Sequence, residues 1–330
     1  MINTRNRLVR VFKSLSLSIP FQVFRPLEIL ALRFCPLRTH RPPVIFIISL
    51  PRSGSTLAYQ CFSSRFALNY LSNFSHFFFR LPLFANLISS FLFYLFGKTS
   101  SFSSSNGFVP GLLGHAEGLL FWSYWMNAAL EEQENADYSA YSKRSNLLLS
   151  VFYALRGFTG IPFLSAYLGH LLCLPRLSSC FPNAIFIRLR RCPILIALSL
   201  YYCLQQSHSD WFSLFPQGCV PYRTQSDVIK VSSQVYWLLK NLDALSNNEN
   251  VFDCSYEQIC YDPELVVECF RIFCCKRGID LMDRFPLPAR FSCRSLDDYP
   301  EALVTSIKQC LRYLVLRHGT VFSLELSDLA

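Results

Sequence analysis

A strand, a short turn and a helix follow one another directly near the start of this chain. Val44 to Leu50 is a continuous apolar run rich in β-branched residues, which is typical of a strand buried in a parallel sheet. Leu57 to Phe66 alternates apolar and polar residues, as a half-buried helix does. The turn between them lies at a helix N-terminus, where free N–H groups and the helix dipole favour an anion. The segment therefore predicts an α/β fold with a phosphate-binding loop.

The turn carries one arginine and several hydroxyl groups but no lysine. It reads Pro-Arg-Ser-Gly-Ser-Thr-Leu from Pro51 to Leu57, so the Gly-x-x-x-x-Gly-Lys-Ser/Thr pattern of nucleotide-binding P-loops is missing at this place. This favours an anion other than the γ-phosphate of ATP. The heptapeptide resembles the 5′-phosphosulfate loop of sulfotransferases that use 3′-phosphoadenosine 5′-phosphosulfate (PAPS). The alternative interpretation is an ordinary Pro/Ser/Gly turn between a strand and a helix.

A second strand end, later in the chain, resembles the 3′-phosphate site of the same family. Pro182 to Leu189 has a buried-strand pattern and is followed by Arg-Arg-Cys-Pro. The family motif is Arg-x-Pro, with a serine six residues after the proline, and Arg191 and Ser199 stand at these positions. Proline suits a first helical position, and arginine and serine can both donate to a phosphate. The structural alternatives are a solvated strand end for Arg191 and an ordinary small helical residue for Ser199.

A third segment, Val251 to Glu264, is similar to the Tyr-Glu-x-Leu-x-x-Asp-Pro-Glu stretch that follows a core strand in this family. Asp262 is a good helix N-cap, Pro263 suits the first helical position, and an acidic first turn is favourable. We expect a helix from there to about Lys276. We interpret this segment as scaffold and assign it no catalytic role.

The resemblance implies a reaction that needs few protein groups. A sulfuryl group moves in line from PAPS to an acceptor hydroxyl or amine, so charge on the leaving phosphate must be neutralised and the acceptor deprotonated. No metal is required. By resemblance, Arg52 acts on the leaving group, and the N–H groups of residues 53–56 hold the 5′-phosphate with the hydroxyls of Ser55 and Thr56. The residues assigned to the nucleotide are Arg52, Ser53, Gly54, Ser55, Thr56, Leu57, Arg191 and Ser199.

A Gly-rich segment, residues 107–118, contains the candidates for the general base. It is followed by aromatic residues and is similar to a Gly-rich, Glu-bearing, Trp-following stretch of many bacterial sulfotransferases. The resemblance implies Glu117 as the base. His115 is the second candidate, because a neutral imidazole also accepts a hydroxyl proton. The structural alternatives are an exposed carboxylate at a helix start for Glu117 and a loop histidine for His115.

The sequence departs from the family pattern at several places. Ser49 stands where glycine is common, and Cys192 replaces the aspartate of Arg-Asp-Pro, which removes an N-capping carboxylate. A lysine expected near residues 160–168 is missing, and no Gly-rich, Trp-containing motif follows near the C-terminus. These departures fit a divergent carbohydrate-type or small-molecule-type member, and they also fit a protein that binds the nucleotide poorly.

The net charge of +9 is concentrated in the first 41 residues, where eight Lys and Arg accompany a single glutamate. Apolar residues recur among them at helical spacing, at Leu8, Val11, Phe12 and Leu15. This pattern fits a short interfacial helix attracted to anionic lipid and fits equally a tail that packs on the domain. We divide the chain into a basic arm, residues 1–41, and one sulfotransferase-like domain, residues 42–330.

Neither a secretory signal nor a membrane-spanning segment is evident. The arm has no continuous apolar region before a cleavage site, and the apolar run from Leu81 to Phe96 is interrupted by polar residues. It falls short of the ~18 to 20 apolar residues that a spanning helix needs. The 14 cysteines show neither a disulfide framework nor metal-ligand spacing. We predict a cytoplasmic protein with reduced cysteines, and peripheral membrane contact through the arm stays open.

The predicted fold is a doubly wound α/β domain with a mainly parallel sheet, a P-loop-like nucleotide-binding core and helices on both faces. Strands at about 44–50, 184–190 and 251–256 carry the nucleotide at their carboxyl ends, as is usual in such sheets. The region from Asn69 to Tyr167 should be mostly helical and form the acceptor side.

The predicted activity is sulfuryl transfer from PAPS to a carbohydrate, lipid or small-molecule acceptor, without a metal and without nucleic acid as a partner. It requires that Arg52 and Arg191 lie close enough for one nucleotide to contact both. Two alternatives stay open: a P-loop-type small-molecule kinase, which would need Mg²⁺ ligands and a loop lysine, and a catalytically decayed, membrane-associated nucleotide-binding protein. Nucleic-acid binding is not expected, because the basic residues lie in one arm without a recognisable module.

Overall fold

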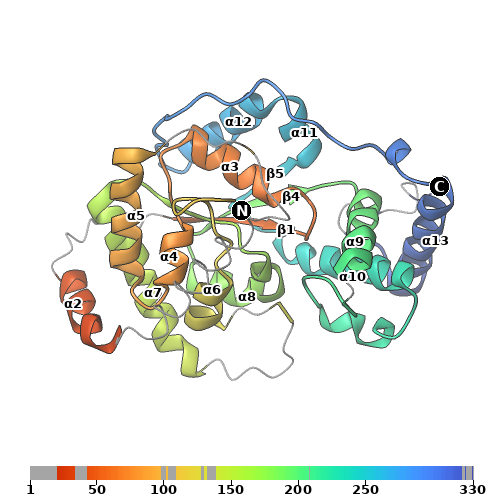
Figure 1. The fold of residues 1–330 in the computed structure, drawn as a ribbon, viewed down its shortest axis with the longest axis horizontal. Coiled ribbons are helices and arrows are strands. Elements are labelled where there is room, and N and C mark those ends of the chain that lie inside the picture. Colours follow the sequence, from red (N-terminus) through yellow and green to blue (C-terminus); the bar gives the residue numbers. More distant parts are fainter. Residues whose placement is uncertain are drawn as a thin grey trace, which may run out of the picture.

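One sheet of five parallel strands runs through the part of the chain that the structure describes (Figure 1). The computed structural model describes residues 21–33, 43–97, 102, 109–127, 130–131, 139–207, 209–321, 324 and 329. The strands are β1 (Val44–Ser49), β2 (Asn69–Tyr70), β3 (Phe163–Ser165), β4 (Ile185–Arg190) and β5 (Val251–Ser255). Their order is β2-β3-β1-β4-β5. β2 and β3 lie on one side of β1, and β4 and β5 lie on the other. The predicted doubly wound fold is therefore confirmed.

The three strands predicted from the sequence coincide with β1, β4 and β5. β4 lies between the other two, so their carboxyl ends meet at one edge of the sheet. β2 and β3 were not predicted, and they lie within the region 69–167 that we expected to be mostly helical. Each has only two or three residues, which is too short to show the alternation by which a half-buried strand is recognised.

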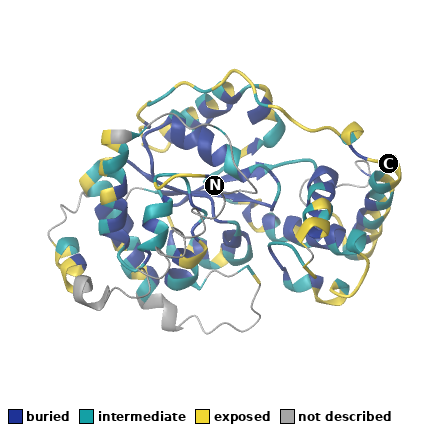
Figure 2. Cartoon of the chain, viewed as in Figure 1, coloured by how far each residue is buried: buried dark blue, intermediate teal, exposed yellow. Residues whose placement is uncertain are grey.

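The side chains of β1 alternate between two apolar cores, which appear as the dark interior of Figure 2. Phe46 and Ile48 belong to one core, and Ile45 and Ile47 belong to the other. The first core is covered by α6 (Leu119–Met126), α7 (Ser139–Thr159) and α8 (Leu174–Cys180), and the second by α3 (Ser55–Arg65), α11 (Tyr256–Tyr261) and α12 (Pro263–Cys275). Both faces of the sheet are therefore covered by helices, as predicted.

Three further helices, α9 (Pro193–Ser207), α10 (Asp227–Leu242) and α13 (Glu301–His318), pack on one another and form a lobe beside the sheet (Figure 1). α10 is amphipathic, because Val231, Val235, Leu238 and Leu242 recur every three or four residues and are buried. The short helix η2 (Gln217–Tyr222) packs on α10. The remaining elements are α2 (Phe21–Arg33), α4 (Asn73–Phe77), α5 (Pro82–Phe96), η1 (Leu168–Cys173), η3 (Asp243–Leu245) and η4 (Leu296–Asp298).

Two helix starts that were predicted from proline are confirmed. α9 begins at Pro193, so Ser199 lies in its second turn, on the helix that follows β4. α12 begins at Pro263, and the Asp262 carboxylate caps it by accepting a 3.0 Å hydrogen bond from the N–H of Leu265. The helix ends at Cys275, close to the predicted end.

Part of the predicted basic arm packs on the domain. α2 lies within residues 1–41 and contacts α7. Its Glu28 is 3% exposed and accepts a 2.6 Å hydrogen bond from the N–H of Leu83, in the first turn of α5. The predicted helix around residues 8–15 lies outside the described residues. Among the helices that are described, none has the length and apolar character needed to cross a membrane. The domain boundary after residue 41 stays a prediction.

Candidate functional site

The predicted phosphate loop is a tight turn between β1 and α3. Arg52 and Gly54 both have left-handed backbone conformations, with φ of 65° and 92°. Ser53 is fully buried and closes the turn, because its hydroxyl and its N–H both donate to the carbonyl oxygen of Leu50, at 2.6 and 3.3 Å. Both hydrogen-bond donors of Ser53 are thus used inside the turn. This residue therefore stabilises the loop and has no donor left for a ligand.

The N–H groups that follow Ser53 are free. In the described structure, the amides of residues 54–57 donate to no acceptor, and the hydroxyls of Ser55 and Thr56 form no hydrogen bond. Unpaired amides of this kind are usual in a first helical turn, and here they combine with the positive end of the α3 dipole. They can therefore hold a phosphate group. Leu57 is partly buried and packs against the core behind the loop.

Arg52, Arg191 and Ser199 come together from three separate elements. A nitrogen of the Arg191 guanidinium, Nη1, donates to the carbonyl oxygen of Arg52 at 2.6 Å. Nε of Arg52 donates to Oγ of Ser199 at 3.0 Å. This contact arises because β1 and β4 are neighbours with parallel strand ends, and α9 starts directly after β4. The proximity of the two arginines, on which the predicted site depends, is therefore present.

Both guanidinium groups keep unused capacity for an anion. Neither Arg52 nor Arg191 forms an ion pair with a carboxylate in the described ranges, and Nε of Arg191 is buried without an acceptor. A cavity of about 560 Å³ opens beside Arg191, lined in part by Arg190 and by Lys308 of α13. This edge of the sheet therefore offers several donors with positive charge and a space next to them.

Two residues of the third segment, Tyr256 and Glu257, also belong to the site. The Arg191 guanidinium lies 4.6 Å from the centre of the Tyr256 ring. The same ring closely approaches Gly54, where an added Cβ would lie 2.1 Å from it. Oε1 of Glu257 accepts a 3.3 Å hydrogen bond from the N–H of Cys192, so it supplies the carboxylate that the Arg-Cys-Pro sequence lacks.

Sequence reasoning treated this Tyr-Glu pair as scaffold. The pair follows β5 directly, and β5 ends at the same sheet edge as β4. This position was the signal by which the pair could have been assigned to the site, since the carboxyl ends of neighbouring parallel strands share one edge of the sheet.

The first candidate base, Glu117, lies just before α6 and is partly buried. Burial raises the pKa of its carboxyl group to about 7. Burial also raises the pKa values of Tyr59 and Tyr167, and the nearby Glu117 carboxylate adds to both shifts. Glu117 forms no hydrogen bond or ion pair with another described residue. It is therefore an enclosed carboxylate with free lone pairs, and the alternative of an exposed helix-start carboxylate does not describe it.

The second candidate, His115, is held in one orientation. Its Nε2 lies 2.6 Å from Oγ of Ser63, and its ring stacks on Tyr70 with centroids 4.3 Å apart. The Ser63 hydroxyl donates to the carbonyl oxygen of Tyr59 at 2.6 Å, so it must accept a hydrogen from Nε2 of His115. The lone pair is then on Nδ1, which is buried and has no hydrogen-bond partner. Burial lowers the pKa of His115 to about 3, so the ring is neutral.

Helix α3 connects the phosphate loop with the two candidate bases. Its N-terminus forms the phosphate loop, and Tyr59, one turn later, contacts the His115 ring with centroids 4.8 Å apart. Glu117 lies near the same tyrosine. Both candidate bases thus lie beside α3, close to Tyr59. Within the described ranges, no three His, Cys, Asp or Glu side chains are grouped so that they could hold a metal ion.

Comparisons with known proteins give one family. The model of the family described as "Sulfotransferase family" matches residues 43–270. Sulfotransferase STF9 from Mycobacterium avium is 14% identical, with a TM-score of 0.51 over 95% of this chain and 80% of its own. The sulfotransferase domain from the curacin biosynthetic pathway is 18% identical, with a TM-score of 0.41 over 73% of this chain and 75% of its own. Sulfotransferase STF1 from Mycobacterium tuberculosis is 14% identical, with a TM-score of 0.44 over 93% and 81%. No curated protein matches this chain. At these identities the similarity to STF9 bears on the fold alone.

Proposed function

This chain belongs to the sulfotransferase family, and we propose that it transfers a sulfuryl group from PAPS to a hydroxyl or amine group of an acceptor. The observation that carries the proposal is the hydrogen-bonded group of Arg191, Arg52 and Ser199 beside the free amides of α3. PAPS carries anionic groups at the 5′ and 3′ positions of one ribose, so it needs two neighbouring anion sites. The loop and the end of β4 offer such a pair.

On the donor side, each residue has a distinct task. PAPS supplies the activated sulfuryl group when it is bound. The amides of residues 54–57, with the hydroxyls of Ser55 and Thr56, bind the 5′-phosphate, and Arg52 neutralises the charge that develops on it. Arg191 binds the 3′-phosphate through its guanidinium group, which lines the cavity, and Ser199 adds a hydroxyl donor. The cavity beside Arg191 has room for the adenosine.

On the acceptor side, the pKa values favour Glu117 as the general base. A base is most effective when its pKa lies near the working pH, and the pKa of Glu117 is about 7. With a pKa of about 3, His115 holds an abstracted proton poorly. His115 lies two residues before Glu117 in the chain, and its Nε2 contacts Ser63 of α3. We propose that Glu117 removes the proton and that His115 positions the segment that carries Glu117.

Aromatic side chains surround the two candidate bases. Tyr59 and Tyr70 contact the His115 ring, and Tyr167 lies near Glu117. We propose from this aromatic environment an apolar acceptor that carries one hydroxyl group, such as a lipid or a hydrophobic metabolite. A glycolipid would also fit this description.

Thermal unfolding with nucleotides tests the donor side. Adenosine 3′,5′-bisphosphate, present at 100 times its Kd, should stabilise the protein by about 2.7 kcal/mol, whereas ATP with Mg²⁺ should have little effect. The Arg191→Ala variant should lose the gain, because the 3′-phosphate loses a charged hydrogen bond. Arg290→Ala is the matched control, since Arg290 is exposed, stacks on Tyr261 and does not line the cavity beside Arg191. Stabilisation by ATP alone would favour the kinase alternative. Equal loss in both variants would contradict the proposed site.

A further inference from the structure

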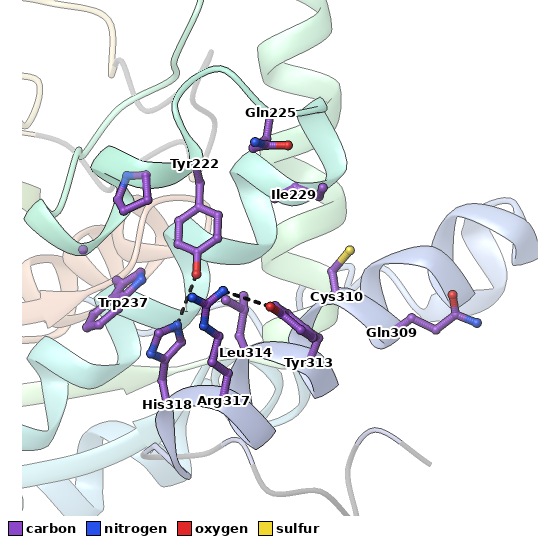
Figure 3. A pocket seen from close by; sticks show the side chains of 12 residues that line it. Tyr222, Gln225, Ile229, Trp237, Gln309, Cys310, Tyr313, Leu314, Arg317 and His318 are labelled. Carbon is purple, nitrogen blue, oxygen red and sulfur yellow. Dashed lines mark hydrogen bonds between the residues drawn. The ribbon is translucent and has the colours of Figure 1, made fainter.

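A cavity in the lobe of α9, α10 and α13 is not used by the proposed reaction. It has a volume of about 540 Å³ and lies between η2, α10 and the C-terminal half of α13 (Figure 3). This volume is within the range of about 300–1,000 Å³ that is usual for small-molecule sites. It shares no lining residue with the cavity beside Arg191. The lobe therefore contains a separate, ligand-sized space.

Aromatic rings form much of the wall. Tyr222 of η2, Trp237 of α10 and Tyr313 of α13 line the cavity, and the His318 ring lies 5.3 Å from that of Trp237. Gly218 allows η2 to lie directly on the indole, since a Cβ at this position would be 2.1 Å from the ring. A flat apolar ring system can lie against such walls with favourable contacts.

The cavity also has an uncompensated positive charge. Arg317 lines it, and Nζ of Lys240 lies 4.7 Å from the centre of the Trp237 ring. Neither cation forms an ion pair with a carboxylate of the described chain, and no Asp or Glu is among the lining residues. The pKa of His318 is lowered by burial and, in addition, by Arg317 and Lys240. Both cations therefore lie close enough to this histidine to disfavour its protonated form.

Arg317 has donors at the cavity for which the described chain supplies no acceptor. Arg317 donates to the hydroxyl of Tyr313 at 2.9 Å, which leaves its other N–H groups without a partner among the described residues. Figure 3 shows this guanidinium beside the hydrogen-bonded pair of Tyr222 and His318. These N–H groups can donate to an anionic group of a ligand in the cavity.

We propose that this cavity binds an aromatic anion, that is, a flat ring system that carries one sulfate, sulfonate, carboxylate or phosphate group. The rings lie against Trp237 and Tyr222. The anionic group pairs with the N–H groups of Arg317 that Tyr313 leaves unused. The site is independent of the sulfuryl-transfer site and does not require that the proposed reaction occurs.

A matched pair of fluorescent probes tests the proposal on the full chain. 8-Anilinonaphthalene-1-sulfonate carries a sulfonate on an aromatic ring system, and N-phenyl-1-naphthylamine has the same rings without the charge. Arg317→Gln should weaken binding of the sulfonate about tenfold, because it loses a charge-assisted hydrogen bond. Binding of the neutral probe should stay unchanged. Arg312→Gln is the control, since Arg312 is exposed on the same helix but does not line the cavity.

Two further measurements locate the bound probe. Cys310 lines the cavity, so the sulfonate should slow its alkylation by iodoacetamide, measured by peptide mass spectrometry, while exposed Cys269 and Cys275 react as before. An excess of adenosine 3′,5′-bisphosphate should not displace the probe. The proposal is overturned if Arg317→Gln and Arg312→Gln have the same effect, if Cys310 is not protected, or if the nucleotide competes with the sulfonate.

Discussion

Gly54 meets two structural demands at a single position. Its φ of 92° lies in a region that side-chain-bearing residues rarely adopt, and the Tyr256 ring occupies the place where a Cβ would be. The same ring lies below the Arg191 guanidinium. The identity of residue 54 therefore affects the turn and, through Tyr256, the second arginine of the site.

The Gly54→Ala variant should lose stability and nucleotide binding together. We expect unfolding in urea to show a loss larger than the 1–3 kcal/mol that a strained backbone conformation alone costs, because the methyl group would also displace Tyr256. Gly160→Ala is the matched control, since Gly160 has φ of 76° but open space around its missing side chain. Equal losses in the two variants would mean that contact with Tyr256 contributes nothing.

The pH dependence of turnover should follow the ionisation of Glu117. The base acts in its deprotonated form, and burial raises its pKa to about 7, so kcat/KM should rise with pH and level off above that value. Glu117→Gln should remove this rise and lower the rate by about 10² to 10⁴.

His115→Gln serves as the comparison for this experiment. The pKa of His115 is about 3, so the variant should keep the rise near pH 7 even if its rate is lower. A rise that persists in Glu117→Gln and disappears in His115→Gln would reverse the two proposed roles.

The neighbouring strands β4 and β5 are joined by side chains as well as by their backbones. Arg188, which is 6% exposed, donates from Nε and Nη2 to the two carboxylate oxygens of Asp253, at 2.6 and 2.7 Å. Residues 188 and 253 are paired directly in the register of the two strands. This pair contributes to the position of both strand ends, which carry Arg191 and Tyr256.

Removing one member of this pair should be worse than removing both. Asp253→Ala should destabilise the protein by about 3 kcal/mol in urea unfolding, since it leaves a buried guanidinium without its bidentate partner. The double variant Arg188→Met, Asp253→Ala should recover part of that loss, because the buried charge is then absent. If the double variant equals the sum of the two single changes, the two side chains are not coupled.

The sequence was sufficient to predict the strands whose residues form a strong local pattern. β1, β4 and β5 have five or six residues, and each is followed within a few residues by a helix, so their existence and, to within about one residue, their ends could be predicted. The contact between Arg52 and Arg191 could be predicted as well, because the carboxyl ends of neighbouring parallel strands share one edge of the sheet. The contacts of Tyr256 with Gly54 and of Ser63 with His115 depend on tertiary placement and have no local pattern. For that reason they could not be predicted from a single sequence.

The whole molecule combines a sheet edge that carries several cations, a lobe with its own cavity, and an N-terminal region that is partly integrated into the domain. The buried carboxylate of Glu28 accepts the N–H of Leu83, so α2 supplies a hydrogen bond that the start of α5 would otherwise lack. The predicted basic arm is thus not a uniform tail. Its residues 21–33 are part of the packed structure, so removing the entire arm would disturb folding as well as any function of its charge.

A shorter deletion separates these two effects. Removing residues 1–20 takes away Arg5, Arg7, Arg10 and Lys13 but keeps α2 and the hydrogen bond between Glu28 and Leu83. Glu28→Ala in the full chain should lower the thermal unfolding temperature, because the Leu83 N–H loses its buried acceptor. If the arm attracts anionic lipid, the deletion should reduce co-sedimentation with phosphatidylserine vesicles, whereas Glu28→Ala should not. Unchanged co-sedimentation after the deletion would show that these four cations do not contribute to lipid binding.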